Sequence, residues 1–202
     1  MIRTEPVQRY LEGLRPPRDP LLAEMEALAA RDGVPIAEWE TGRLLHTLVA
    51  ALQPRLVVEV GTAIGYATLP MARALAGDGR IVTLERDPGR AAHARAFFAR
   101  DPAGARVEVV EGDALESLPR LDGPFDLAFV ATRTGMPRHV ALLEGRMAPG
   151  ALLAIDHLLA GGDVDAAPPV ARELMTSPHW RFSVLPVGDG VGLGARRATV
   201  AA

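Results

Sequence analysis

The sequence contains no cysteine among its 202 residues. Disulfide bonds, thiolate metal sites and cysteine nucleophiles are therefore excluded. No apolar run reaches the ~18 residues that a helix needs to span a bilayer. The opening segment, MIRTEPVQRYLEG, also lacks the apolar core of a signal peptide, so we expect a cytoplasmic protein.

The chain also lacks a surplus of basic residues. Its formal net charge is −3, so we expect neither nucleic acid nor a membrane surface as a partner. Hydrophobic residues make up 49% of the composition and charged residues 23%, which is typical of a globular chain with a full core. A small molecule is the partner that this composition favours.

The first quarter of the chain is predicted to be helical. Apolar residues recur at helical spacing over residues 21–29 and again over residues 39–52. Gly33 ends the first pattern and Pro54 ends the second. We expect residues 1–53 to form a helical extension of a single domain, placed as a lid over cofactor and substrate.

After Pro54, strands and helices alternate. Strands are expected at residues 56–60, 80–85, 106–112, 125–131, 151–156, 181–187 and 190–197, and helices at 66–75, 88–100, 114–118, 137–147 and 168–175. This alternation predicts a doubly wound α/β fold with a parallel, Rossmann-like sheet over residues 54–202. The turn Gly188-Asp189-Gly190 predicts a closing hairpin, with one antiparallel strand at the edge of the sheet.

The segment VVEVGTAIGY, residues 57–66, ends the first strand of this sheet. Ligands of doubly wound sheets bind at the carboxyl ends of the strands. Gly61 lets the backbone turn sharply there, and Gly65 lets a helix or a ligand come close. Glu85 ends the next strand, where an acid accepts hydrogen bonds from the hydroxyls of a ribose. An adenosine-type ligand is therefore expected.

The glycine spacing distinguishes between adenosine-type ligands. A dinucleotide needs G-x-G-x-x-G around its pyrophosphate, but here Ala63 takes the middle place and Glu59 would repel the phosphates. S-adenosylmethionine carries a ribose and an ammonium group without phosphate, and it fits better. A nicotinamide oxidoreductase is a weaker alternative. A turn without any ligand is disfavoured by Glu85 and by Gly112-Asp113-Ala114 after the third strand.

Three segments of the sequence resemble a known family: GVPIAEWETGRLLHTLV, VVEVGTAIGYATLPMARALAGDGRIVTLERDP and VEVVEGDALESLPRLDGPFDLAFV. They are similar to the S-adenosylmethionine-dependent O-methyltransferases of the catechol and caffeoyl-CoA type, above all to the bacterial members. The resemblance runs from about residue 30 to the closing LPVGDGVGLGARR. It implies a seven-stranded methyltransferase sheet with N-terminal helices that shape the substrate entrance, and a homodimer.

The resemblance also implies roles for individual residues. It places Glu59, Gly61, Thr62, Gly65 and Tyr66 around the methionine part of the cofactor, Glu85 and Arg86 at the ribose and adenine, Asp113 and Ala114 at the adenine edge, and Ala131 at the end of the fourth strand. Ala67 stands where the family has Ser, so one hydrogen bond to the cofactor is expected to be missing. Trp39, Thr41 and Gly42 lie in the segment that closes over the cofactor in the family.

The chain departs from the family at the metal site. The family holds a divalent metal with an Asp after the fourth strand and an Asp-Asn pair after the fifth. After the fourth strand, this sequence has FVATRT where the family has FIDADK, so Ala131, Arg133 and Thr134 replace Asp, Asp and Lys. After the fifth strand, Asp156 is kept and His157 replaces Asn. Ala131 supplies no ligand and Arg133 adds positive charge, so we expect no catalytic magnesium or calcium. Asp156 and His157 alone would hold a softer metal only weakly.

Without a metal, a general base must prepare the acceptor for methyl transfer. His157 is the candidate base, with Asp156 orienting it or acting itself. Arg133 is a candidate to hold an anionic part of the substrate. The plainer interpretation of both is a structural histidine and a solvated loop arginine.

The acceptor itself stays open, as does the choice between oxygen and nitrogen as the atom methylated. The loops at residues 131–137 and 158–165 contain no aromatic ring, so a flat acceptor stacked between rings is not indicated. Of the other histidines, His46 is expected to pack, and His139 has no predicted partner. We predict a metal-independent O-methyltransferase of a small-molecule hydroxyl; the alternative is a cofactor-binding pseudoenzyme that has lost the chemistry.

Overall fold

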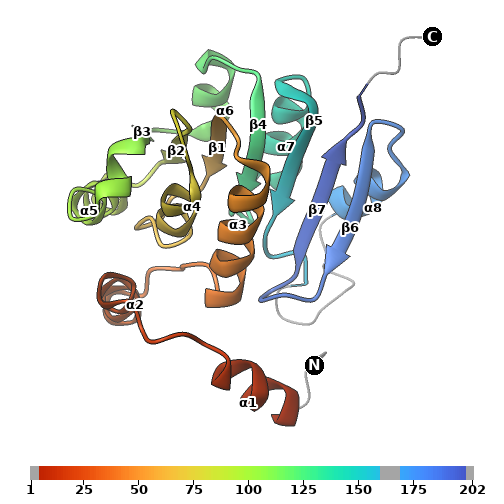
Figure 1. Ribbon diagram of the computed structural model, residues 1–202. Helices are drawn as coiled ribbons and strands as arrows, with labels where there is room; N and C mark the ends of the chain where they lie inside the picture. The colour runs from red at the N-terminus through yellow and green to blue at the C-terminus, as the bar shows by residue number, and fades with distance from the viewer. Residues whose placement is uncertain (1–4, 160–168, 199–202) are drawn as a thin grey trace.

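Seven strands form one twisted sheet in the order β3-β2-β1-β4-β5-β7-β6 (Figure 1). The computed structural model describes residues 5–159 and 169–198. The strands are β1 (Leu56–Val60), β2 (Arg80–Glu85), β3 (Val107–Glu111), β4 (Phe125–Val130), β5 (Met147–Ile155), β6 (Trp180–Leu185) and β7 (Val191–Arg196). Strands β1 to β5 run parallel, and β7 runs antiparallel to both of its neighbours. The prediction of a doubly wound α/β fold with an antiparallel C-terminal hairpin strand is confirmed.

One detail of that hairpin differs from the prediction. The antiparallel strand β7 lies between β5 and β6, so the edge strand is β6. Glycines in β7 make this packing possible, because a Cβ at Gly192 would lie 2.4 Å from the ring of Phe182 and 2.6 Å from Leu158. Bare backbone in β7 thus leaves room for an aromatic ring of β6.

Helices cover both faces of the sheet (Figure 1). They are α1 (Glu5–Gly13), α2 (Pro20–Asp32), α3 (Trp39–Leu52), α4 (Thr68–Ala74), α5 (Pro88–Phe98), α6 (Ala114–Ser117), α7 (Met136–Glu144) and α8 (Pro169–Thr176), with short 3-10 helices η1 (Pro102–Arg106) and η2 (Leu118–Arg120). Helices α3 and α4 pack on one face, and α7 and α8 on the other. The buried side chains of a strand alternate between these layers: Val57 faces α3 and α4, and Val58 faces α7 and α8.

Aspartates begin several of the helices. Asp19 accepts a hydrogen bond from the N–H of Leu22 at the start of α2, and Asp87 accepts one from the N–H of Arg90 at the start of α5. A proline follows each aspartate at the first helical position, where its missing N–H costs nothing. These caps set where the chain turns from a loop or strand end into the helix that covers the sheet.

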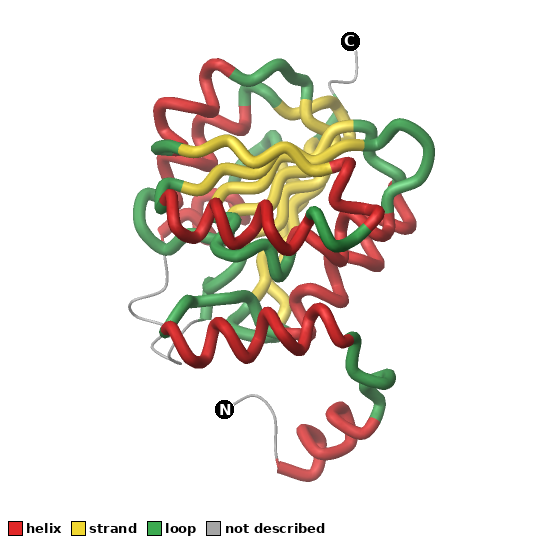
Figure 2. The backbone as a smooth tube through the Cα atoms, turned by 90° about the vertical axis from the view of Figure 1, so that its left-hand side faces the viewer, coloured by secondary structure: helices red, strands yellow, loops and turns green. Residues whose placement is uncertain are grey.

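The first helix stands apart from the body of the molecule (Figure 2). No residue of α1 is buried, whereas α2 and α3 contribute buried side chains such as Met25 and Leu45 to the core. Among the described residues, no helix is long and apolar enough to cross a membrane. The lid role of residues 1–53 stays a prediction.

Candidate functional site

A cavity of about 540 Å³ opens at the carboxyl ends of the parallel strands. Most of the predicted cofactor residues line it: Gly61, Thr62, Tyr66, Glu85, Arg86, Asp113, Ala114 and Ala131. His157 lines it as well, whereas Glu59, Gly65 and Asp156 are not part of its wall. A cavity of this size is in the range of small-molecule and cofactor sites. The cofactor roles of these residues stay predictions, and for Glu59 and Gly65 they would be indirect.

The two glycines of the loop after β1, Gly61 and Gly65, allow close contacts with different neighbours. Gly61 has a φ of 98°, and a Cβ there would lie 2.8 Å from the methyl carbon of Thr132. Gly65 has a φ of 88°, and a Cβ there would lie 2.4 Å from the ring of Phe98 in α5. Gly61 therefore lets the β4 loop approach the β1 loop, and Gly65 admits a helix rather than a ligand.

Glu85 ties the first loop to the end of β2. Its Oε2 accepts a hydrogen bond from the N–H of Ala63 at 2.7 Å, and its Oε1 accepts one from the N–H of Asp87 at 2.9 Å. Ala63 itself has a left-handed φ of 49°. Because a carboxylate offers about four acceptor positions, Glu85 can still accept hydrogen bonds from two ribose hydroxyls.

Glu59 lies behind the cavity wall and is fully buried. Its Oε2 accepts hydrogen bonds from the hydroxyl groups of Thr68 and, at 2.6 Å, Thr83. Its Oε1 is buried without a partner among the described residues. Burial raises the pKa of Glu59 to about 7, against the lowering effect of the two threonines.

Tyr66 lines both this cavity and a second one. Its hydroxyl donates a hydrogen bond to Glu26 of α2 at 2.6 Å. The second cavity, of about 470 Å³, is also lined by Trp39 and Gly42. Pro35, Ile36 and Ala37, just before the residues that the resemblance indicated, line the first cavity. The closing role of Trp39, Thr41 and Gly42 stays a prediction.

Near the carboxyl ends of β4 and β5, the carboxylate of Asp189 contacts two basic side chains. Oδ2 of Asp189, in the β6–β7 turn, lies 3.3 Å from Nδ1 of His157 and 3.2 Å from a guanidinium nitrogen of Arg133. Asp156 is buried, and its Oδ1 accepts the backbone N–H of His157 at 2.8 Å. Burial raises the pKa of Asp156, although the nearby imidazole lowers it. The side chain that contacts the imidazole is therefore Asp189.

Comparison with known proteins decides the family. A model of the O-methyltransferase family matches residues 18–197. The catechol O-methyltransferase of Mycobacterium tuberculosis is 36% identical over 164 residues, which cover 78% of this chain and 74% of that protein. The chain belongs to the O-methyltransferase family. Sequence and family model agree over nearly the whole described part of this methyltransferase.

Solved structures agree with this assignment. A methyltransferase from Geobacter sulfurreducens superposes with a TM-score of 0.90 at 30% identity, over 98% of this chain and 99% of that one. The O-methyltransferase from Bacillus cereus, solved in complex with SAH, superposes with a TM-score of 0.85 at 26% identity, over 95% and 97% of the two chains. The prediction of an S-adenosylmethionine-dependent O-methyltransferase is confirmed.

The metal-site positions of this methyltransferase do not offer the ligands of a hard divalent cation. Ala131 has no ligand atom, and Arg133 is cationic and paired with Asp189. One oxygen of Asp156 is engaged by the backbone of His157. Within residues 5–159 and 169–198, no group of three acidic or histidine side chains is arranged to hold a metal ion. Such a cation prefers near-octahedral oxygen ligands, and the side chains of Ala131, Arg133 and His157 supply no oxygen. The absence of a catalytic metal stays a prediction.

Two site residues of the methyltransferase were not predicted from the sequence. Asp189 was assigned only to a turn, because a Gly-Asp-Gly triplet indicates a hairpin and says nothing about its tertiary neighbours. His139 is buried on the cavity wall, with Nδ1 3.1 Å from the hydroxyl of Thr132. The available signal was its place on the apolar face of α7, beside Met136 and Val140.

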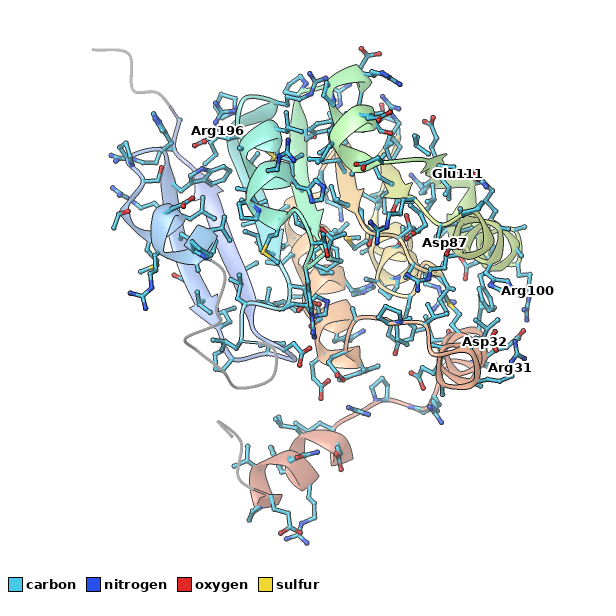
Figure 3. The ribbon with its side chains drawn as sticks, turned by 180° about the vertical axis from the view of Figure 1, so that it is seen from behind. Arg31, Asp32, Asp87, Arg100, Glu111 and Arg196 are labelled. Atoms are coloured by element: carbon cyan, nitrogen blue, oxygen red, sulfur yellow. The ribbon has the colours of Figure 1, made fainter. Side chains whose placement is uncertain are left out.

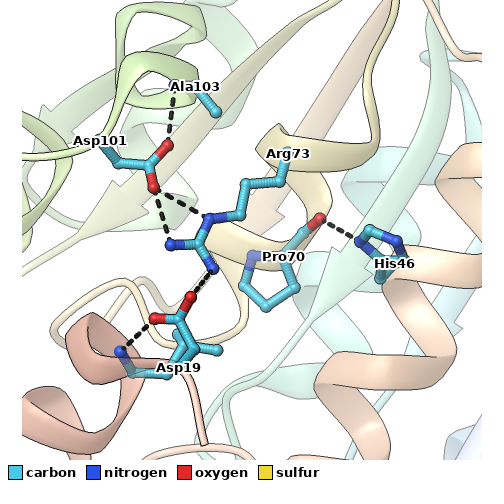
Figure 4. Close-up of polar contacts among 7 residues, drawn as sticks. Asp19, His46, Pro70, Arg73, Asp101 and Ala103 are labelled. Atoms are coloured by element: carbon cyan, nitrogen blue, oxygen red, sulfur yellow. Dashed lines mark hydrogen bonds and ion pairs between the residues drawn. The ribbon is translucent and has the colours of Figure 1, made fainter. Parts of the chain in front are cut away.

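The other histidines lie away from the cavity. His46 is half-buried, and its Nδ1 lies 2.9 Å from the carbonyl oxygen of Pro70, so it packs between α3 and α4 as predicted (Figure 4). His93 and His179 are exposed. Only His139 and His157 are therefore placed to act on a ligand of this cavity.

Proposed function

We propose that this methyltransferase methylates the hydroxyl group of a small molecule without a catalytic metal, with His157 as general base. The observation that supports this most is the contact between His157 and Asp189 beside the cavity. In the related family, metal ligands occupy the positions of Ala131, Asp156 and His157. A base at the same place would supply the function that those ligands support, which is deprotonation of the acceptor.

The cofactor would lie along the cavity from Glu85 to His157. Glu85 would hold the ribose, and the turn at Asp113 and Ala114 would border the adenine. Ala67 and Ala131 line the cavity, and their methyl groups would border the methionine end. S-adenosylmethionine supplies an electrophilic methyl group on its sulfonium. The protein's part is to exclude water and to align the acceptor with that methyl group.

His157 would act through its second ring nitrogen. Nδ1–H donates to Asp189, which fixes the tautomer and leaves Nε2 as the acceptor for the proton of the hydroxyl. As the oxygen–methyl bond formed, the sulfur–methyl bond would break, the proton would pass to Nε2 of His157 and a neutral thioether would leave. His157 has a φ of 64°, an uncommon conformation for a residue other than glycine, and such outliers cluster at functional sites.

The test is turnover measured as S-adenosylhomocysteine production, in EDTA and in excess magnesium. A catechol is the first acceptor to try, because the relative from M. tuberculosis is named for that substrate. We expect equal rates in both buffers. We expect His157→Ala to lower kcat by about 10²- to 10⁴-fold, the usual effect of removing a general base. Asp189→Asn should lower it about tenfold, because the tautomer is no longer fixed.

The exposed His93 provides a matched control, and His93→Ala should leave kcat unchanged. Activity that vanishes in EDTA and returns with magnesium would contradict the metal-free mechanism. Tight binding of S-adenosylmethionine without turnover of any acceptor would instead favour a binding protein that has lost the chemistry.

We also propose a homodimer, built through α1. Val7, Tyr10 and Leu14 expose apolar surface on or just after this helix, with 48%, 67% and 60% of each residue's surface accessible. A second copy of the chain is the partner that the family resemblance favours. An interface there would cover an apolar stripe that the protomer leaves in water.

A further inference from the structure

His139 is enclosed on the wall of the cofactor cavity by the turn that precedes its own helix. Only 6% of its surface is exposed. Gly135 has a φ of 75°, and a Cβ at this position would lie 3.2 Å from Cε1 of the imidazole. The ring therefore packs directly on the backbone of the turn, and its position is set before any ligand binds.

Thr132 orients this ring. Its hydroxyl lies 3.1 Å from Nδ1 of His139, and both residues line the cavity. The methyl group of Thr132 is held in turn by the close approach to Gly61, where a Cβ would lie only 2.8 Å away. Gly61 therefore makes room for Thr132, and Thr132 holds one nitrogen of the imidazole.

The other nitrogen, Nε2, has no hydrogen-bond partner within the described ranges 5–159 and 169–198. Nε2 is not among the side-chain atoms that are buried without a partner, so it keeps accessible surface for a ligand of the cavity that His139 lines. Burial lowers the pKa of His139, although the negative charge of Asp113 raises it. A neutral imidazole donates through one nitrogen and accepts through the other. The hydroxyl of Thr132 can accept from Nδ1–H, and in that tautomer Nε2 is the acceptor.

Asp113 lines the same cavity as His139. Its charge acts on the imidazole, and its Oδ1 accepts the N–H of Leu115 at 2.8 Å, capping α6. Its second oxygen has no bond to another group in the described chain. Two hydrogen-bond acceptors thus border the region where the adenine edge is expected.

We propose that His139 reads the amino group of the cofactor's adenine. Nδ1–H donates to Thr132, Nε2 accepts one amino hydrogen, and Asp113 accepts the other. A base that carries an oxo group in place of the amino group would place its oxygen, a hydrogen-bond acceptor, against two other acceptors, Nε2 of His139 and the carboxylate of Asp113. The site would therefore bind such a base more weakly. This inference rests on the proposed cofactor site and adds its base specificity.

The test compares two product analogues, S-adenosylhomocysteine and S-inosylhomocysteine, by calorimetry. We expect the wild type to prefer the adenosyl compound by roughly twentyfold, and His139→Leu to reduce that ratio about fivefold, the value of a neutral hydrogen bond. His139→Gln, whose amide oxygen can accept, should retain most of the preference. His93→Leu removes an exposed histidine outside the cavity and should match the wild type.

An unchanged ratio in folded His139→Leu would overturn the inference and leave the proposed function standing. If that variant does not fold by circular dichroism, Thr132→Val decides, because it frees the ring and should lower the ratio about threefold; an unchanged ratio there also overturns it. A wild-type protein that binds neither compound would overturn both the inference and the proposed function.

Discussion

At the scale of the residue, Glu59 shows how burial changes a side chain's chemistry. Its carboxyl group is fully buried, two threonines donate to one oxygen, and the other oxygen has no partner in the described chain. The pKa of Glu59 is raised from 4.5 to about 7. The folded state therefore keeps a proton over a pH range in which the unfolded chain has lost it.

This difference predicts a pH-dependent stability. Because the folded pKa is raised, stability falls as pH rises from about 4.5 to about 7, by at most about 3 kcal/mol. Glu59→Gln keeps an oxygen for both threonines and cannot ionise, so its stability should lack this part of the decline. Urea denaturation of both proteins at about pH 5 and about pH 7.5 measures it. Parallel declines in the two proteins would show that folding does not raise the pKa of Glu59.

At the scale of the element, one arginine of α4 joins three segments. The guanidinium of Arg73 donates to Asp19 at the start of α2 and, through two nitrogens, to Asp101 before η1 (Figure 4). The three side chains are mostly buried, between 12% and 34% exposed. The planar fork of arginine can reach both carboxylates at once, whereas an ammonium is a single point charge.

Arg73→Lys should therefore lower the free energy of unfolding by about 1–2 kcal/mol, measured by urea denaturation. The matched control is Arg31→Lys, in the exposed pair of Arg31 and Asp32 on the surface of α2 (Figure 3). Exposed pairs contribute little, so the control should hardly change stability. An equal effect of both substitutions would mean that the bridge does not hold α2 against α4.

At the scale of the whole molecule, α1 contributes no buried residue to the core. It extends from the body (Figure 2), and its apolar side chains face water in the single chain. Tyr10→Glu combined with Leu14→Glu should shift a dimer to a monomer in light scattering after gel filtration, because charge is costly in an apolar interface. Leu52→Glu, at an exposed apolar site that ends α3, is the control and should leave the mass unchanged. A wild-type protein that elutes as a monomer would refute the proposed interface.

The local pattern of the sequence predicted most elements but misplaced the fifth strand. β1 and β2 have the predicted bounds, because short apolar runs between turn residues identify buried strands. β5 begins at Met147 rather than Ala151, where the sequence suggested the end of a helix closed by Pro149 and Gly150. Met147 pairs with Phe125, and the next pair is Leu127 with Leu152, so the register shifts over the segment that contains Pro149. Pairing across strands outweighs local helix signals.

The amino-acid sequence by itself determined the sheet, the glycine loop and the acid at the end of β2, because these depend on spacing along the chain. It also showed that the metal-site positions had changed. Only the tertiary structure decided that His157 contacts Asp189 and that His139 faces the cavity beside Thr132. Such pairs lie on different elements, and their distances depend on how the β4 loop, α7 and the hairpin pack at one edge of the sheet. The sequence pattern reports the face of an element, whereas packing decides which side chain lies opposite.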